Sequence, residues 1–301
     1  MGEVRLLLIG AGRMGQTHVR ALRHSERVRI VAVADPSEEA RAIATELDSD
    51  LHSHAELAAA LHNEHVDGVL IAAPSTLHRH LVAACAERGL PILCEKPCGV
   101  SVGDIDAAAQ AAEAAGVHLQ VGYWRRYVPE LIQLREQLRA GRFGELLMVS
   151  CWQWDASPPD PAFSKSSGGI VIDMAVHELD QIRWLTGDEL VPSSARSGAG
   201  GEDPDCIAAL LKLSGGAAAL ISLGRHFPHG DCVWVELMGR RDHARVQVLW
   251  GEPGESVFLA ALCAQAEDFA RVIREGAPSR GASAADARRA LELAQALTEP
   301  N

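Results

Sequence analysis

The stretch "VRLLLIGAGRMG", residues 4–15, decides the fold of the first half of this chain. The apolar run Val4–Ile9 predicts a buried strand, and the pattern that begins near Met14 predicts a helix. The glycines between them have the spacing GxGxxG, which allows a tight turn and close approach of backbone N–H groups to a pyrophosphate. The amino terminus of the helix adds a partial positive charge. We therefore expect a dinucleotide to bind this loop, at Gly10, Gly12, Arg13, Met14 and Gly15.

A second predicted strand, "VRIVAVADP", ends at Asp35. This acid follows Gly15 by about 20 residues, the distance at which such a residue accepts a hydrogen bond from the ribose 2′-hydroxyl. A carboxylate at this place repels a 2′-phosphate, and no arginine follows it until Arg41. The expected cofactor is NAD, with NADP less favoured.

Strand and helix patterns alternate up to residue 122, which predicts a Rossmann-type parallel sheet wound on both faces by helices. A ligand of such a sheet binds beyond the carboxyl ends of its strands. The segments "APSTLH" (73–78) and "EKP" (95–97) follow two of these strands. Lys96 could hydrogen-bond a substrate hydroxyl there, or it could be an ordinary surface lysine. The cofactor contacts expected from the two segments are Ala73, Pro74, Ser75, His78, Glu95, Lys96 and Pro97.

From residue 123 the pattern changes to longer β-rich runs joined by short glycine turns. Such runs predict an α+β domain on a large, mostly antiparallel sheet. A chain of 301 residues exceeds what one core usually covers, so two domains are expected. We place a dinucleotide-binding domain at 1–122 and a substrate-binding and oligomerisation domain at 123–301, with the last helix a candidate to pack back on the first domain.

The stretch "GGIVIDMAVHELD" (168–180) sets three titratable residues among apolar ones. On an α-helix from Ile170 to Leu185, Asp173, His177 and Asp180 would share one face of a helix that is otherwise apolar and therefore buried. They could form an internal ion pair, or they could do chemistry. Oxidation of an alcohol by a nicotinamide needs a base for the hydroxyl proton, and histidine has a suitable ordinary pKa. The role of Asp180 stays open.

Composition excludes several classes of function. The formal net charge of −12 argues against a nucleic-acid partner, since phosphate neutralisation needs a surplus of Lys and Arg. No apolar run approaches the ~18 residues of a membrane span. Seven scattered cysteines without a CxxC pair predict reduced thiols in a cytoplasm. No clustered set of metal ligands is evident, and no metal is expected.

Six motifs, "GAGRMG", "AVADP", "APSTLH", "CEKP", "GYWRRY" and "GGIVIDMAVHELD", occur in an order and spacing that resemble the Gfo/Idh/MocA oxidoreductases over essentially the whole chain. The likeness is greatest to inositol 2-dehydrogenase-like members. It implies that His177 is the acid/base, that Lys96 polarises the reacting oxygen, and that Asp173 binds substrate and orients His177. It also implies a cis Lys96–Pro97 bond, and a homo-oligomer (dimer or tetramer) formed through the outer face of the C-terminal sheet.

The sequence departs from inositol dehydrogenases in places that bear on the substrate. Trp124 is bulkier than expected, and His226, His229 and Asp231 stand where those enzymes often carry tyrosine. We therefore expect an NAD-dependent dehydrogenase or ketoreductase for a secondary alcohol of a cyclic polyol, sugar or aminosugar. The alternatives are NAD-assisted glycoside hydrolysis or elimination, and a non-catalytic NAD-sensing regulator. The substrate contacts expected are Lys96, Trp124, Arg126, Trp154, Asp173, His177 and His229.

Overall fold

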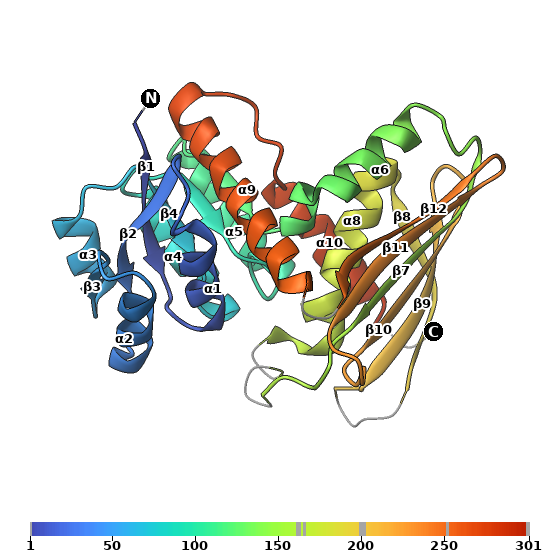
Figure 1. Cartoon of the computed structure of the whole chain (residues 1–301), viewed down its shortest axis with the longest axis horizontal. Helices are drawn as coiled ribbons and strands as arrows, with labels where there is room; N and C mark the ends of the chain where they lie inside the picture. The colour runs from blue at the N-terminus through green and yellow to red at the C-terminus, as the bar shows by residue number, and fades with distance from the viewer. Residues whose placement is uncertain (1, 161–163, 165–166, 199–202, 251–252, 299–301) are drawn as a thin grey trace. The chain divides into compact units, whose positions relative to one another are not determined.

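The computed structural model describes residues 2–160, 164, 167–198, 203–250 and 253–298. The chain forms two compact units (Figure 1), each described by itself. The first comprises Met1–Trp124 and Leu259–Ala287, and the second comprises Arg125–Phe258 and Arg288–Asn301. The division at residues 122 and 123 remains a prediction, because compact packing does not show that either segment folds independently.

The first unit contains a six-stranded parallel sheet in the order β3-β2-β1-β4-β5-β6, as predicted. This is the strand order of a Rossmann fold, in which the order reverses between β1 and β4. The strands are β1 (Val4–Ile9), β2 (Val28–Ala34), β3 (His52–His54), β4 (Gly68–Ile71), β5 (Ile92–Cys94) and β6 (Leu119–Val121). The helices between them are α1 (Arg13–Leu22), α2 (Glu38–Leu47), α3 (Leu57–Asn63), η1 (Ser75–Leu77), α4 (His78–Ala86) and α5 (Val102–Ala114).

The core of this unit explains why a late segment of the chain joins it. Leu6 and Leu8 of β1 are fully buried, as a strand covered on both faces requires. Ala266 and Phe269 of α9 (Pro253–Glu275) belong to the same apolar cluster. Residues 259–287 therefore complete the first core, although the β-rich region precedes them in the sequence.

The second unit contains a mixed, mostly antiparallel sheet in the order β12-β11-β7-β10-β9-β8, which confirms the predicted fold class. Among the strand pairs described in it, only β7 and β10 are parallel. The strands are β7 (Leu146–Trp154), β8 (Leu190–Ser197), β9 (Cys206–Leu213), β10 (Ala218–Gly224), β11 (Cys232–Gly239) and β12 (His243–Trp250). The helices are η2 (Trp124–Tyr127), α6 (Pro129–Arg139), η3 (Val171–Ala175), α8 (Val176–Thr186) and α10 (Ala284–Ala296), of which η2 and α10 begin in the first unit.

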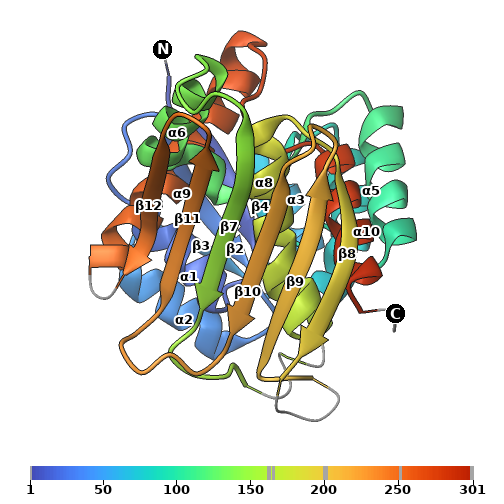
Figure 2. The same cartoon turned by 90° about the vertical axis from the view of Figure 1, so that its right-hand side faces the viewer.

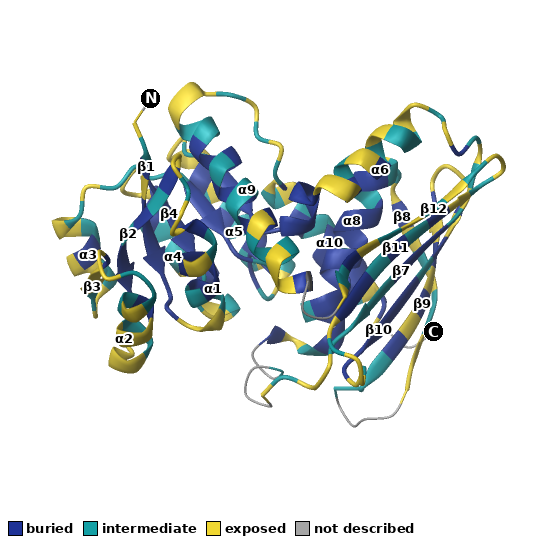
Figure 3. Cartoon of the chain, in the orientation of Figure 1, coloured by how far each residue is buried: buried dark blue, intermediate teal, exposed yellow. Residues whose placement is uncertain are grey.

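The two faces of the second sheet differ sharply. Helices α6 and α8 lie on one face, and Figure 2 shows the other face with no described helix of this unit in front of it. Side chains alternate between the faces with a period of two. Val149 and Val235 on the covered face are fully buried, whereas Leu210 on the other face is 47% exposed. Helix α8 is buried along almost its whole length, in contrast to α2 (Figure 3).

Candidate functional site

The glycine loop has the geometry that the sequence predicts. Gly10 has φ of 96°, and a Cβ there would lie 2.6 Å from the Ala73 nitrogen. A Cβ on Gly15 would collide with the Gly10 carbonyl, so both positions require glycine. Gly12 instead faces open space and supplies no side chain to cap α1. The first-turn N–H groups of α1 can therefore be reached by an anion, which is what binding of a dinucleotide pyrophosphate demands.

Asp35 is anchored to that loop. Its Oδ2 accepts a hydrogen bond from the Ala11 nitrogen at 2.7 Å, and its Oδ1 accepts one from the Ser37 nitrogen at 2.8 Å. A carboxylate has about four acceptor sites, so both oxygens can still accept from ribose hydroxyls. The loop and the acid thus fit NAD together, at the carboxyl ends of β1 and β2.

His78 connects two of the predicted cofactor segments. Its Nδ1 lies 2.8 Å from the Pro97 carbonyl oxygen and its Nε2 lies 2.8 Å from the Ala73 carbonyl oxygen. The ring is 1% exposed, and burial lowers the pKa of His78 below its ordinary value of 6.5. Both ring nitrogens therefore face backbone carbonyls, and the neutral ring donates to one of them. His78 thus connects the backbone at Ala73 with the backbone at Pro97. This geometry does not support a direct hydrogen bond from His78 to a cofactor.

Glu95 is also engaged within the protein. It is 7% exposed, and its Oε1 lies 2.7 Å from His18 Nε2. Its Oε2 accepts a hydrogen bond from the backbone nitrogen of Lys96 at 3.2 Å. Lys96 follows directly at the end of β5, and the Lys96–Pro97 bond is cis, as the family resemblance implied. The cofactor residues expected from the sequence thus gather at one edge of one sheet. Sequence reasoning missed His18, whose only signal was its place on the helix of the glycine loop.

The helix of the second unit begins in a glycine turn. Gly168 and Gly169 have φ of 86° and 78°, which only glycine adopts readily. The Ile170 nitrogen donates to Asp203 Oδ1 at 2.7 Å, and the other oxygen of Asp203 pairs with the buried Arg225. Residues 203 and 225 were not predicted to take part. They connect the loop after β8 and the end of β10 to the start of the helix.

The helix itself differs from the predicted one at its first turn. Residues Val171–Ala175 form a π-helix, and the α-helical part is Val176–Thr186. The step of about 100° per residue that an α-helix has therefore does not hold up to Ala175. The common face of Asp173 and His177 stays a prediction. π turns are rare and occur often at functional sites. His177 is buried, and Asp173 is half-buried.

Asp180, whose role the sequence left open, is the partner of Arg126. The guanidinium Nε donates to Oδ2 at 2.9 Å and Nη2 donates to Oδ1 at 2.5 Å. Both residues are buried, with Asp180 2% exposed. This bidentate pair uses the Nε and Nη2 donors of the Arg126 guanidinium, which was expected to contact substrate. The geometry thus favours a structural role for both residues.

A second buried pair was missed by sequence reasoning. Arg125 donates from Nη1 to Glu178 Oε1 at 2.5 Å and from Nη2 to Gln153 Oε1 at 2.7 Å. Glu178 is fully buried on α8. The available signal was the match between two adjacent arginines and two acids spaced by two on the helix. One arginine pairs with each acid.

Two predicted substrate contacts lie elsewhere in the second unit. Trp154 donates from Nε1 to Ser222 Oγ at 3.0 Å, and its ring covers Gly224. Strand alternation puts Trp154 on the face of the sheet that α8 does not cover. His229 makes an edge contact with Phe227, with ring centroids 5.7 Å apart. The structure does not group Trp154 with Asp173 and His177, and Trp124 is buried at the end of the first segment.

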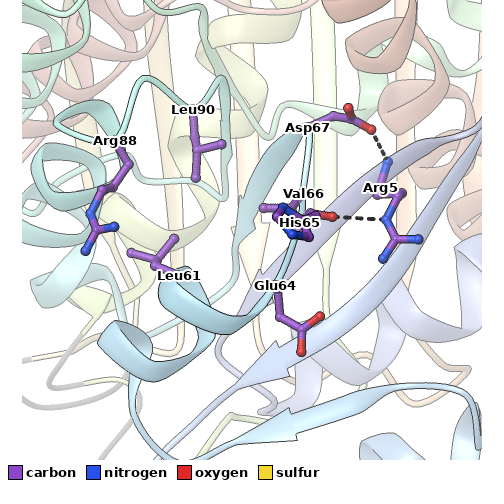
Figure 4. A pocket seen from close by; sticks show the side chains of 8 residues that line it. All are labelled: Arg5, Leu61, Glu64, His65, Val66, Asp67, Arg88 and Leu90. Carbon is purple, nitrogen blue, oxygen red and sulfur yellow. Dashed lines mark hydrogen bonds between the residues drawn. The ribbon is translucent and has the colours of Figure 1, made fainter.

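A cavity of about 330 Å³ lies at the other edge of the first sheet (Figure 4). Its lining residues precede β4 and β5 or start β1, so it faces away from the glycine loop. Arg5 donates from its backbone nitrogen to Asp67 and from Nε to the His65 carbonyl. The lining consists of Arg5, Leu61, Glu64, His65, Val66, Asp67, Arg88 and Leu90.

Three further features of the described part of the chain bear on its function. Its His, Cys, Asp and Glu residues form no group of three that could hold a metal ion. The seven cysteines are all free thiols. Among the helices described, none combines the length and the apolarity needed to cross a membrane.

Known proteins resemble both units. Residues 4–123 match the oxidoreductase family with an NAD-binding Rossmann fold, and residues 131–245 match the GFO/IDH/MocA C-terminal domain. The chain is 50% identical to the rhizopine catabolism protein MocA of Rhizobium meliloti, over 99% of this chain and 95% of that protein. It is 32% identical to an inositol 2-dehydrogenase of Rhizobium meliloti (strain 1021), over 79% of this chain and 74% of that one.

Solved structures agree. The myo-inositol 2-dehydrogenase from Lactobacillus plantarum superposes with a TM-score of 0.88 at 26% identity, covering 98% of this chain and 96% of that one. A scyllo-inositol dehydrogenase from Lactobacillus casei, solved with NAD(H) and scyllo-inositol, has a TM-score of 0.86 at 22% identity, over 98% and 96% of the two chains. At that identity the likeness concerns the fold alone.

Proposed function

Because the chain belongs to the Gfo/Idh/MocA oxidoreductase family, whose first domain binds NAD, we propose that it oxidises a secondary alcohol of a cyclic polyol, or reduces the matching ketone. The observation that carries the proposal is the edge of the first sheet, where an open glycine loop, the anchored Asp35 and Lys96 come together. The polyol is suggested by relatives named as inositol dehydrogenases. A sugar or aminosugar belongs to the same chemical class.

We assign separate roles to three residues. NAD, when bound, supplies the acceptor for a hydride from carbon. His177 takes the hydroxyl proton during oxidation and returns it during reduction, which suits an imidazole near neutral pH. Lys96 donates a hydrogen bond to the reacting oxygen and stabilises negative charge that develops there. Asp173 binds a substrate hydroxyl and orients the His177 ring.

The first test is turnover. The purified chain is mixed with NAD+ or NADP+ and a panel of inositols, hexoses and amino-substituted polyols, and formation of reduced cofactor is followed. We expect turnover with NAD+ and a fall of about 10²–10⁴-fold in kcat for His177→Ala, the usual contribution of a general acid/base. The exposed His24→Gln is the matched control. Full turnover by His177→Ala would contradict the role of His177.

The panel also separates the alternatives. Release of an aglycone from a glycoside without net NADH would identify hydrolysis or elimination instead of dehydrogenation. NAD+ binding without turnover of any panel member would support a sensing role. The cytoplasmic location, predicted from the cysteines, stays a prediction.

We also propose that the chain forms a homo-oligomer through the uncovered face of the second sheet. Trp152 and Trp234 stack there with ring centroids 5.1 Å apart, and Trp234 also lies 6.1 Å from Trp250. Leu210 and Met238 are exposed on the same face. Large apolar side chains that gather on one exposed face often mark an interaction site. Light scattering after gel filtration should give a multiple of 32.2 kDa, and Leu210→Glu should lower it; a monomeric wild type would refute the proposal.

A further inference from the structure

His18 is a fully buried polar residue on the helix that follows the glycine loop. Its Nε2 lies 2.7 Å from Glu95 Oε1, and across the described residues no hydrogen-bond partner reaches its Nδ1. Leaving an imidazole nitrogen buried without a partner is unfavourable. The ring is nevertheless placed there, which indicates that its contact with Glu95 matters.

The Glu95 carboxylate is enclosed by three elements of the first unit. His18 of α1 forms a hydrogen bond with Oε1, and the backbone nitrogen of Lys96 donates to Oε2 at 3.2 Å. At the end of β6, a Cβ on Gly122 would lie 2.9 Å from the same Oε2. Gly122 has no positive φ, so its small size and not its backbone freedom makes room for the carboxylate. The position of Glu95 is thus fixed from three directions.

Glu95 in turn fixes the backbone of the residue that follows it. A hydrogen bond between a carboxylate and a backbone N–H is charge-assisted and stronger than a neutral one. If the imidazole of His18 were removed, this buried carboxylate would be free to turn. Its hydrogen bond to the backbone nitrogen of Lys96 would then be lost. Residues that act on a reacting atom must keep their position closely, since displacement by about 1 Å can reduce turnover about 10²-fold.

We infer that His18 is a positioning residue: through the Glu95 carboxylate it holds Lys96 in place at the carboxyl end of β5. The catalytic role of Lys96 in this inference rests on the proposed function. The positioning of Lys96 by His18 and Glu95 does not depend on it. Because His18 lies on α1, it also connects the helix of the cofactor loop with the Lys96 segment. In this role His18 contacts neither cofactor nor substrate.

The experiment compares His18→Leu, His18→Gln and Gly122→Ala with the exposed control His24→Gln. Leucine removes the hydrogen bond, glutamine restores a donor, and alanine displaces the carboxylate while leaving His18 intact. We expect His18→Leu and Gly122→Ala to lower kcat about tenfold or more while the NAD+ dissociation constant, measured by calorimetry, stays close to that of wild type. His18→Gln should recover most of kcat. Because Gly122→Ala retains the imidazole, it remains informative if His18→Leu does not fold.

A second readout needs no turnover. Acetic anhydride labels lysines at rates that depend on their surroundings, and peptide mass spectrometry resolves Lys96 from the exposed Lys212. The labelling of Lys96 relative to Lys212 should change in His18→Leu and Gly122→Ala and return in His18→Gln. If it changes but no substrate is ever turned over, the proposed function fails and the positioning inference stands. Unchanged labelling and kcat in a folded His18→Leu, or equal losses in kcat and NAD+ binding, would overturn the inference.

Discussion

The cofactor end of the first sheet and helix α8 of the second unit hold their polar groups in different ways. At the carboxyl ends of the strands of the first sheet, Asp35 and His78 bond to backbone groups, and Glu95 bonds to the His18 side chain and to the backbone nitrogen of Lys96. On α8, Glu178 and Asp180 pair with the guanidinium groups of Arg125 and Arg126. The first arrangement fixes the loops at the carboxyl ends of the strands. The second fixes a whole helix through buried charges. Removing one partner of such a pair lowers the free energy of unfolding.

The largest expected effect tests this cost. Replacing Arg126 by Ala leaves the Asp180 carboxylate buried without its bidentate partner, and breaking such a pair lowers the free energy of unfolding by about 3–5 kcal/mol. Urea denaturation followed by circular dichroism measures it. In the double variant Arg126→Met/Asp180→Leu, most of the loss should be recovered, because no buried charge is left.

The control for this prediction is an ion pair at the surface. Arg240 and Glu145 are both largely exposed, and Arg240→Ala should leave the urea midpoint close to that of wild type. Equal destabilisation by Arg240→Ala and Arg126→Ala would contradict the view that burial sets the difference.

A smaller effect is expected at the turn that starts the helix. Gly169→Ala forces a left-handed backbone on alanine, which destabilises by roughly 1–2 kcal/mol, and its Cβ would also lie 2.8 Å from Asp203 Oδ1. Gly216→Ala has the same kind of backbone, with φ of 97°, but its Cβ meets open space. Gly169→Ala should therefore lower the unfolding free energy more than Gly216→Ala. It should also lower kcat, which Gly216→Ala should spare; the reverse order would show that the contact with Asp203 is not important.

The smallest effect is a pH dependence in the first unit. Burial lowers the pKa of His78 in the folded state, while the opposing influences are the two carbonyls and Glu95. The unfolded chain therefore binds a proton at higher pH than the folded chain does. The contribution of His78 to the unfolding free energy should be complete above a pH of about 6.5, and it should be lost as the pH drops from there towards the folded-state pKa.

The measurement is urea denaturation at several pH values between 5 and 8 for wild type, His78→Gln and the exposed His80→Gln. The slope should be shallower in His78→Gln than in His80→Gln. His118 has a lowered pKa for the same reason, so His78→Gln should reduce the slope without abolishing it. An identical slope in all three proteins would show that His78 does not contribute.

Much of the first unit follows from local sequence. The run Val4–Ile9, the three glycines and Asp35 lie within one βαβ segment, and their spacing predicts both a Rossmann-type parallel sheet and the place of the cofactor. The function of His78 and Glu95 could not be predicted in this way. Both stand at the expected edge of the sheet, but their partners, Pro97 and His18, are set by packing of distant segments.

The second unit shows the same limit more strongly. The sequence indicates that 168–180 carries a buried helix with polar residues, and that a mostly antiparallel sheet follows. It does not give the π turn at Val171–Ala175, which includes Asp173. It also places Trp154 among substrate contacts, although strand register puts it on the uncovered face of the sheet.

The sequence by itself determined the family, the Rossmann sheet, the NAD loop and the identity of Lys96, Asp173 and His177 as candidates. These depend on the order and short spacing of residues along the chain. Only the tertiary structure decided that Asp180 belongs to Arg126, that Glu178 belongs to Arg125, and that Glu95 belongs to His18. These pairs join residues more than fifty positions apart, and a buried charge takes its partner from whichever segment the packing brings beside it.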